Sequence, residues 1–230
     1  MEKFSEGGWM FAIKKLVIAN EGAIGIGSMI IFIALLLIAG VAASVLIQTA
    51  TNLQNQALET GRDTLKEVAN GIKVTLISGK TNGDNITELA IFVETISASD
   101  EIDLEHAHIE LSDDNKKVII RYDNNYFNDS VASGGLFGTM DVTGLSATSF
   151  GIIVVRDHDG SCSSTKPIIN DQDMVVLMVN ISSSFGNGSS NSGIGTRIEV
   201  QGGVYPEFGM RGLINFYTPS VFVDTVIDLK

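Results

Sequence analysis

The feature that most constrains this chain is a long stretch without any charge. No Asp, Glu, Lys or Arg occurs between Glu21 and Glu59, and residues 24–47 are almost entirely apolar. At about 1.5 Å per residue, a helix over that apolar segment is about 36 Å long, enough to cross a bilayer core of about 30 Å. A helix that is apolar on every side is stable only in lipid or inside an assembly. The stretch must therefore contact a membrane or other protein chains.

Small residues recur along this stretch and favour close packing between helices. They are Gly25, Gly27, Ala34, Ala39, Gly40, Ala42, Ala43 and Ser44. An ordinary membrane anchor or a secretory signal peptide also has a hydrophobic helix. A signal-peptide core spans roughly 7 to 15 residues, however, whereas this stretch is longer and continues directly into a polar helical segment.

Residues 48–71 continue the helix with one apolar stripe. Leu58, Leu65 and Ile72 repeat every seventh residue, which places them on one helix face. Asn70 and Gly71 tolerate a left-handed backbone, so we expect the helix to end there in a left-handed cap. Gly61 lowers the helix propensity and marks the place where a kink or break would occur.

The charge of the chain is unevenly distributed. It has 15 Lys plus Arg against 27 Asp plus Glu, a net charge of -12. Residues 81–230 hold 8 basic and 21 acidic residues, a net charge of -13. Such a surface repels phosphate backbones, so nucleic acid is excluded as a partner.

From Ile72 onward the apolar pattern alternates, which is typical of strands. We expect strands at residues 72–78, 87–96, 102–111, 117–122, 150–156, 174–181, 196–201, 212–217 and 221–228. The faces of 102–111 are mixed, which leaves the pairing of that strand open. Polar turns separate the strands. Eight or nine short strands predict an antiparallel β-sandwich, so the fold class is α+β, with a long hydrophobic N-terminal helix before the sandwich.

The chain carries no motif for catalysis or for a bound cofactor. It has neither a Gly-x-Ser-x-Gly elbow nor a phosphate-binding glycine loop between a strand and a helix. We therefore expect no enzymatic activity and no cofactor.

A metal site has only weak candidates. Asp157, Asp159, Asp171 and Asp173 are carboxylates of the kind that bind Ca²⁺, but the full calcium loop with its closing glutamate is missing. Solvated turn acids are the simpler interpretation. His106 and His108 would point to one face of a strand, yet no third ligand stands at a fixed spacing.

Cys162 is the only cysteine, so a disulfide within the chain is excluded. Its neighbours, Asp-Gly before and Ser-Ser after, are typical of a loop, and we expect an exposed thiol.

The N-terminal residues match a known pattern. A short charged leader, Gly22-Ala23, then Ile24-Gly25-Ile26-Gly27 and a long apolar helix resemble the class III signal of type IV pilin-like proteins, and more closely that of archaeal flagellins, or archaellins. The C-terminal residues 204–209, 212–216 and 224–229 resemble the closing strands of archaellins. Bacterial-type pilins usually have glutamate at the fifth mature residue, where this sequence has Gly27.

The resemblance implies three parts and a set of partners. Residues 1–22 form a leader that a prepilin-type signal peptidase removes between Gly22 and Ala23, which leaves 208 residues. Residues 23–71 form the helical filament core, and residues 72–230 form an immunoglobulin-like sandwich outside it. Many copies build a cell-surface filament for swimming and adhesion. An assembly ATPase and its membrane platform draw subunits from the cytoplasmic membrane, where the precursor resides.

Four Asn-x-Ser/Thr sequons are candidate glycosylation sites in an exported domain. They begin at Asn85, Asn128, Asn180 and Asn187. Archaellins resemble one another in carrying N-linked glycans in such loops.

Two other functions remain open at this stage. The chain could be the subunit of a type IV pilin-like adhesion pilus, or a membrane-anchored binding module that uses residues 157–173 as a ligand loop. A mature N-terminus at Ala23 favours a filament subunit, and an uncut N-terminus favours an anchored module.

Overall fold

The computed structural model describes residues 7–96, 101–170, 173–186 and 193–230, with the backbone alone for residues 7–21 and 23. The chain divides into two compact units, Met1–Gly61 and Arg62–Lys230. The first unit is helical throughout its described part. The second contains the end of that helix and all the strands.

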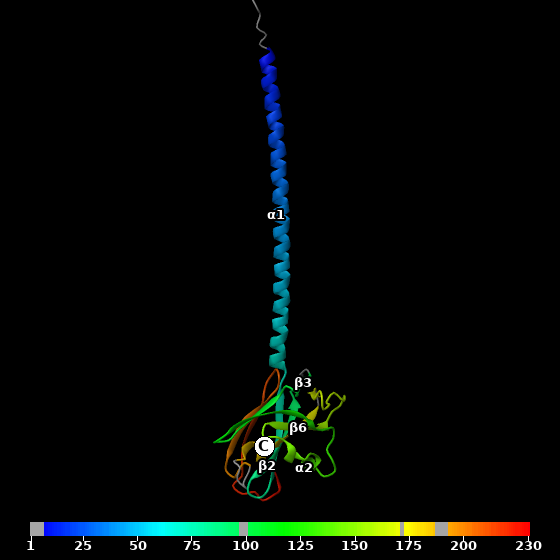
Figure 1. The fold of residues 1–230 in the computed structure, drawn as a ribbon, viewed down its shortest axis with the longest axis vertical. Helices are drawn as coiled ribbons and strands as arrows, with labels where there is room; N and C mark the ends of the chain where they lie inside the picture. Colours follow the sequence, from blue (N-terminus) through cyan, green and yellow to red (C-terminus); the bar gives the residue numbers. More distant parts are fainter. Residues whose placement is uncertain (1–6, 97–100, 171–172, 187–192) are drawn as a thin grey trace, which may run out of the picture. The chain divides into compact units, whose positions relative to one another are not determined.

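Helix α1, Gly7–Ala69, is a single helix of 63 residues (Figure 1). It contains no proline, and the leucine, alanine and isoleucine residues of its centre sustain a helix once their side chains are buried. The hydrogen-bonded helix passes through Gly61 without a break. The predicted end at residues 70–71 is right within two residues.

The predicted left-handed cap is wrong, because neither Asn70 nor Gly71 has a positive φ. Gly71 has a different role. Its backbone forms a parallel bridge with Met210, and a Cβ at Gly71 would lie 2.9 Å from the Met210 Cβ and 2.8 Å from the Ile96 Cδ1. The chain needs glycine there because two neighbouring segments approach too closely for a side chain.

In the described residues after α1, the chain forms eleven strands and three short helices. The strands are β1 Ile72–Thr81, β2 Ile86–Thr95, β3 Ile102–Asp103, β4 His108–Ser112, β5 Lys117–Asn128, β6 Ser149–Arg156, β7 Ile168–Ile169, β8 Met174–Asn180, β9 Glu199–Tyr205, β10 Gly212–Tyr217 and β11 Val226–Asp228. The short helices are α2 Leu136–Thr139, η1 Val142–Gly144 and α3 Ile181–Phe185.

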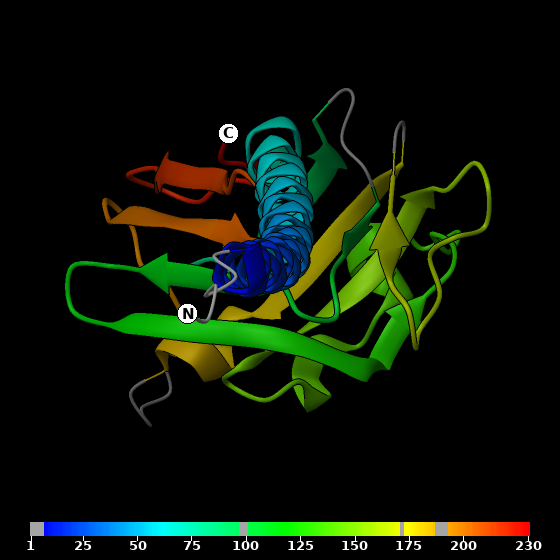
Figure 2. The ribbon, with the colours of Figure 1, turned by 90° about the horizontal axis from the view of Figure 1, so that it is seen from above.

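Nine strands form one sheet in the order β10-β9-β4-β5-β6-β8-β2-β1-β11, and β3 pairs with β7 separately. All pairs are antiparallel except β5 with β6. Strand β10, at one end of the large sheet, lies against β1, which is next to the other end, since a Cβ at Gly212 of β10 would lie 2.9 Å from the Val74 Cγ2 of β1. The sheet thus folds over into two layers around one core, and the predicted α+β class with a sandwich is confirmed. Figure 2 shows the green β4–β5 pair beside the orange β9 and β10.

The main core lies between the two layers and takes side chains from both halves of the sheet, including Ile77, Ile91, Ile109, Phe150 and Ile214. A second cluster covers the outer face of the central strands, where Met140, Val142 and Leu145 pack on Ile153 and Met178. Strands β6 and β8 are therefore buried on both faces, which explains their unbroken apolar sequences.

The predicted strand 102–111 is wrong as a single element. Residues 104–107 form a turn in which the Asp103 carboxylate accepts a hydrogen bond from the Glu105 N–H at 2.8 Å. The turn splits the segment into β3, which pairs with β7, and β4, which pairs with β5 and β9. Residues 102–111 show no consistent apolar face because they belong to two short strands and the turn between them.

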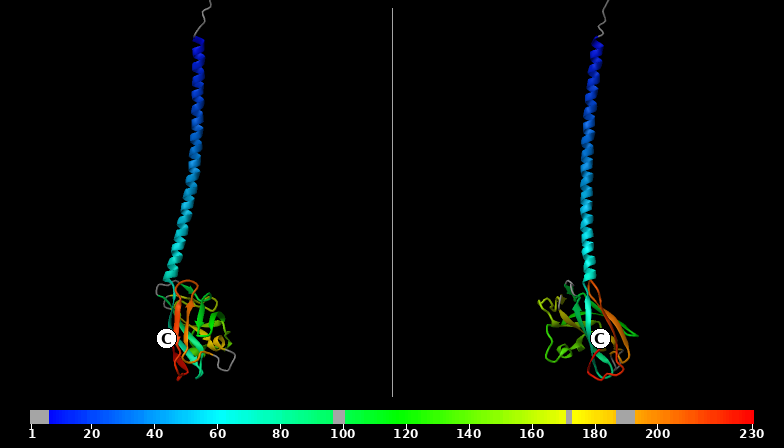
Figure 3. Two further views of the ribbon diagram at one scale, coloured as in Figure 1. Left: turned by 90° about the vertical axis from the view of Figure 1, so that its left-hand side faces the viewer. Right: turned by 180° about the vertical axis from the view of Figure 1, so that it is seen from behind.

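Other strand boundaries also differ from the prediction. Strand β5 extends six residues beyond Tyr122, to Asn128. Strand β9 begins at Glu199, after Arg197, whose φ is 61°. Strand β11 covers only Val226–Asp228, because residues 219–225 form an irregular segment. That segment is coloured red in Figure 3.

Candidate functional site

The central part of α1 exposes its apolar side chains in the described structure. Its large apolar side chains between Ile24 and Ile47 are each 56–71% exposed. A Cβ at Gly25, Gly27 or Gly40 would meet nothing within 4 Å. The segment beginning at Ile24 also has the length and hydropathy to span a membrane. Such a surface is far larger than the apolar patches that soluble monomers expose, so it marks an interaction site.

Gly22 and Ala23, the predicted cleavage residues, lie within α1, and Gly22 is exposed. Gly25 and Gly27 follow within five residues. A glycine in a helix interior costs roughly 1 kcal/mol relative to alanine. The helix is therefore locally weak around Gly22 and Ala23.

The sequons lie in different environments. Asn85 is buried, and its Nδ2 has no hydrogen-bond partner among the described residues. Asn180 is also buried: its Nδ2 donates to the Val142 carbonyl at 2.8 Å, and its Oδ1 accepts from the Ser183 N–H at 3.1 Å. Asn128 is half-buried at the end of β5, beside exposed residues 129–130. Asn187 lies outside the described residues.

Three of the four predicted metal ligands come together. Asp157, Asp159 and Asp173 each place a carboxylate oxygen within 4.8 Å of the other two. Asp171 lies outside the described residues. The sequence did not show this convergence, because the Asp157 loop and the start of β8 meet only in the folded chain.

Backbone and amide N–H groups hold these carboxylates in place. Asp157 accepts from the Gly160 and Cys162 N–H groups at 2.8 and 3.1 Å, and the fully buried Asp173 accepts from those of His158 and Asn170, each at 3.1 Å. Hydrogen bonds from Ser161 and Asn170 lower the pKa of Asp159.

The other candidates are not part of this cluster. His106 is exposed in the turn after β3, whereas the His108 ring stacks on Tyr205 with ring centroids 5.0 Å apart. The expected exposed thiol is wrong, because Cys162 is buried at 9% exposure. Burial, with the nearby carboxylates of Asp157 and Asp173, raises the pKa of the Cys162 thiol to about 12.

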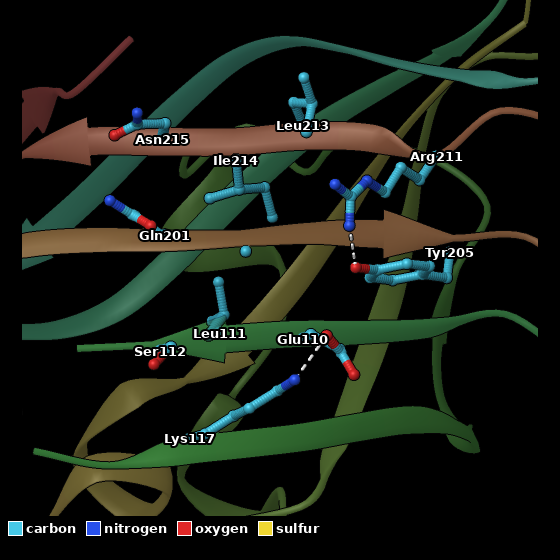
Figure 4. Close-up of a pocket in the computed structure, with 11 residues that line it drawn as sticks. Glu110, Leu111, Ser112, Lys117, Gln201, Tyr205, Arg211, Leu213, Ile214 and Asn215 are labelled. Carbon is cyan, nitrogen blue, oxygen red and sulfur yellow. Dashed lines mark hydrogen bonds and ion pairs between the residues drawn. The ribbon is translucent and has the colours of Figure 1, made fainter. Parts of the chain in front are cut away.

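Sequence reasoning missed a groove on the outer face of the sheet, between β4, β5, β9 and β10 (Figure 4). Its volume is about 460 Å³. The Lys117 Nζ pairs with the Glu110 carboxylate at 2.9 Å, and Arg211 donates a hydrogen bond to the Tyr205 hydroxyl. Two pairs of consecutive strands that are distant from each other in sequence, β4–β5 and β9–β10, build this groove, so no local motif could reveal it.

The family comparison covers most of the chain. A model of the archaeal-type flagellin family matches residues 22–216. Flagellin B2 of Methanocaldococcus jannaschii is 40% identical over 214 residues, which cover 92% of this chain and 96% of that protein. Flagellin B3 of Methanococcus voltae is 36% identical over 244 residues, which cover 95% of this chain and 100% of that protein.

Solved structures share the fold. A crystal structure of an archaeal flagellin from Methanocaldococcus jannaschii superposes with a TM-score of 0.60 at 29% identity, covering 70% of this chain and 97% of that one. The archaeal flagellum of Methanospirillum hungatei gives a TM-score of 0.60 at 12% identity, covering 88% of this chain and 98% of that one. With the apolar helix and the two-layer β domain, these matches lead to one conclusion: the chain belongs to the archaeal-type flagellin family.

Proposed function

We propose that this protein is a structural subunit that polymerises through α1 into a cell-surface filament for swimming. The observation that carries the proposal is the apolar surface of residues 24–47, which the chain itself leaves exposed. Burying a Leu, Ile or Phe side chain gains about 1.5–3 kcal/mol, so bundled copies of α1 are strongly stabilised relative to water. The role is mechanical and involves no enzymatic activity.

Assembly from the membrane needs an input of energy. Lipid covers the same apolar side chains as neighbouring helices do, so the exchange of lipid for protein contacts is close to neutral. We assign the drive to an assembly ATPase and its membrane platform, which draw subunits from the cytoplasmic membrane. Once assembled, the filament is held by helix packing and by contacts between the β domains.

The leader 1–22 prevents early polymerisation. It holds three basic and three acidic residues, Lys3, Lys14, Lys15, Glu2, Glu6 and Glu21. Buried charges without partners are costly, so a leader retained at the end of a helix bundle opposes packing. Cleavage by a prepilin-type signal peptidase between Gly22 and Ala23 removes this obstacle.

N-terminal sequencing of subunits recovered from sheared surface filaments tests the proposal. We expect a start at Ala23, and we expect a Gly22→Val variant to remain as an uncut precursor in the membrane. A Gly8→Val variant, altered within the leader but away from the cut, is the matched control and should be processed. Surface filaments built from uncut chains would overturn the proposal, and an uncut membrane protein without filaments would favour an anchored binding module. A start at Ala23 in non-rotating fibres would instead indicate an adhesion pilus.

Among the described sequons, we propose Asn128 as the N-glycosylated residue. Its side chain is half-buried, whereas those of Asn85 and Asn180 are inside the folded domain. Asn187 remains a candidate from sequence. Mass spectrometry of native filament subunits should find a glycan on Asn128. Subunits of an Asn128→Gln variant should lack the mass of that glycan. An unmodified Asn128 together with a modified Asn85 would contradict the assignment.

We also propose that Asp157, Asp159 and Asp173 can hold a divalent cation with oxygen ligands. The three carboxylates place oxygens within 4.8 Å of one another, so their negative charges repel and a bound cation would offset that repulsion. Each carboxylate oxygen that accepts one N–H still has a lone pair available to a metal ion. Ca²⁺ suits such oxygen ligands. Adding Ca²⁺ to chelator-treated protein should raise Tm, and Asp159→Asn should reduce the rise. An equal rise in the variant would exclude this site.

A further inference from the structure

The β domains of a filament need a way to contact one another despite their acidity. Residues 81–230 carry a net charge of -13 from 8 basic and 21 acidic residues. Like-charged surfaces repel, so stable contacts require uncharged or oppositely charged patches. Two such features lie on this domain: a projecting segment before β11 and the groove over β4, β9 and β10.

We call the projecting segment, residues 221–224, the knob. Val223 is 87% exposed, and Val221 is 66% exposed. Between them, Phe222 is buried in the main core. The Thr81 N–H donates to the Thr225 carbonyl at 2.8 Å, and the Thr81 hydroxyl donates to the Asp224 carbonyl at 3.1 Å. The knob is thus anchored on both sides of Val223, while its two valines face solvent.

The knob also carries a charge without a local partner. Asp224 is exposed, and among the described residues no hydrogen bond or ion pair involves its carboxylate. A surface that presents an apolar Val223 beside the Asp224 carboxylate is complementary to a site with an apolar wall and a cation.

The groove has these two properties. Leu213 lines it and is 59% exposed. The hydrogen bond from Lys117 lowers the pKa of Glu110, so this pair is neutral as a whole, and the positive charge left in the groove is that of Arg211. A Cβ at Gly202 would overlap the Glu110 carbonyl oxygen, so β9 needs glycine where it approaches β4. Figure 4 shows Leu213 and Arg211 on the same rim of the groove.

The knob and the groove lie toward opposite ends of β1. Gly212, next to Arg211, contacts Ile72 and Val74 near the start of the strand, whereas the knob is held by Thr81 at its end. Ten strand residues span about 30 Å. Contact between unlike surfaces at opposite ends of a subunit is heterologous, and it generates an open helical array when the rotation between subunits does not close a ring.

We propose that the knob of one subunit docks into the groove of the next, with Val223 against Leu213 and Asp224 against Arg211. The occupant of the groove is thus a second copy of this chain. The inference rests on the proposed filament function, which supplies many copies in a repeating arrangement. It names the contact between β domains that accompanies the packing of α1.

Chemical cross-linking tests the contact. Filaments are sheared from cells that produce the full chain with Val223→Cys and Leu213→Cys, and are treated with a short bismaleimide. Cys162 does not interfere, because its thiol is buried and has a pKa of about 12. We expect covalent dimers, trimers and longer products on a denaturing gel. Each single variant should give monomers, and so should the control pair Val131→Cys with Leu213→Cys, in which Val131 is an exposed loop residue.

Two results would overturn the contact. One is intact filaments of the double variant that give only monomers. The other is dimers from Leu213→Cys alone as abundant as those from the double variant, since these would show groove-to-groove pairing. In both cases filaments are present, so the filament function stands. Absence of surface filaments from the unmodified chain would instead contradict the function itself.

Charge reversal provides a second test that does not need cross-linking. Asp224→Lys or Arg211→Asp alone should cause filaments to disassemble at a lower temperature, and the double variant should recover most of the loss. The recovery should shrink in high salt, because salt screens exposed ion pairs. A double variant no more stable than the weaker single variant would contradict the pairing.

Discussion

In the β domain, the structural role of individual residues depends on close approach and burial more than on local backbone preference. Gly71 follows the helix and was expected to cap it, yet it permits contact between the start of β1 and Met210. Cys162 follows a loop-like sequence, yet its side chain reaches the main core. Neither property could be read from neighbouring residues, because both depend on segments distant in the chain.

Gly71→Ala should destabilise the β domain. The added Cβ would overlap the Met210 Cβ at 2.9 Å and the Met210 carbonyl at 3.0 Å, and overpacking of this kind costs about 1–3 kcal/mol. Thermal unfolding of the detergent-solubilised full chain measures the effect. Gly138→Ala is the matched control, because a Cβ there meets nothing within 4 Å. Equal Tm values for both variants would contradict the close approach.

The Cys162 thiol should react very slowly in the folded protein. Its pKa is raised from 9.0 to about 12, so at pH 8 the thiolate fraction is about 1,000-fold lower than in the unfolded chain. We expect labelling by iodoacetamide to require denaturant. Because the folded pKa is raised, burial of the neutral thiol stabilises the fold below pH 9, and this contribution falls as the pH rises toward 12. Rapid labelling of the native chain would show that the thiol is exposed.

At the scale of elements, the charge-free segment and the alternating strands were predictable, and their pairing was not. β1, β2, β6, β8 and β10 have strong local patterns and lie within a few residues of their predicted positions, as does the end of α1. The start of α1 differs, because the helix begins at Gly7, within the predicted leader. The split of 102–111 occurs at a turn held by a side-chain hydrogen bond of Asp103 and by backbone hydrogen bonds of Leu104. The Asp157–Asp173 cluster and the groove depend on the sheet order, which sequence alone does not determine.

Leu36→Lys should abolish filament formation. Leu36 is 57% exposed near the middle of the apolar segment. A lysine at the centre of a membrane helix costs about 2.5–3.5 kcal/mol, and an unpaired charge in a dry helix bundle costs more. Electron microscopy of cells counts the filaments. Leu36→Met conserves volume and should assemble normally, whereas abundant filaments from Leu36→Lys would mean that this part of α1 is not buried.

At the scale of the whole molecule, the distribution of charge distinguishes the role of the helix from that of the β domain. Removing residues 1–22 takes away three basic and three acidic residues, so the net charge of -12 is unchanged. Residues 81–230 carry a net charge of -13 and residues 59–80 carry +1, while the segment from Gly22 to Leu58 has none. The uncharged helix supplies the cohesive surface, and the acidic β domain keeps the polymer soluble.

Electron cryomicroscopy of the native filament tests the central claim most directly. We predict that residues 24–47 of many subunits pack together along the filament axis, starting from Ala23, with the β domains outside. A map with the β domains along the axis, or with the apolar segment of α1 left uncovered by other subunits, would contradict the account.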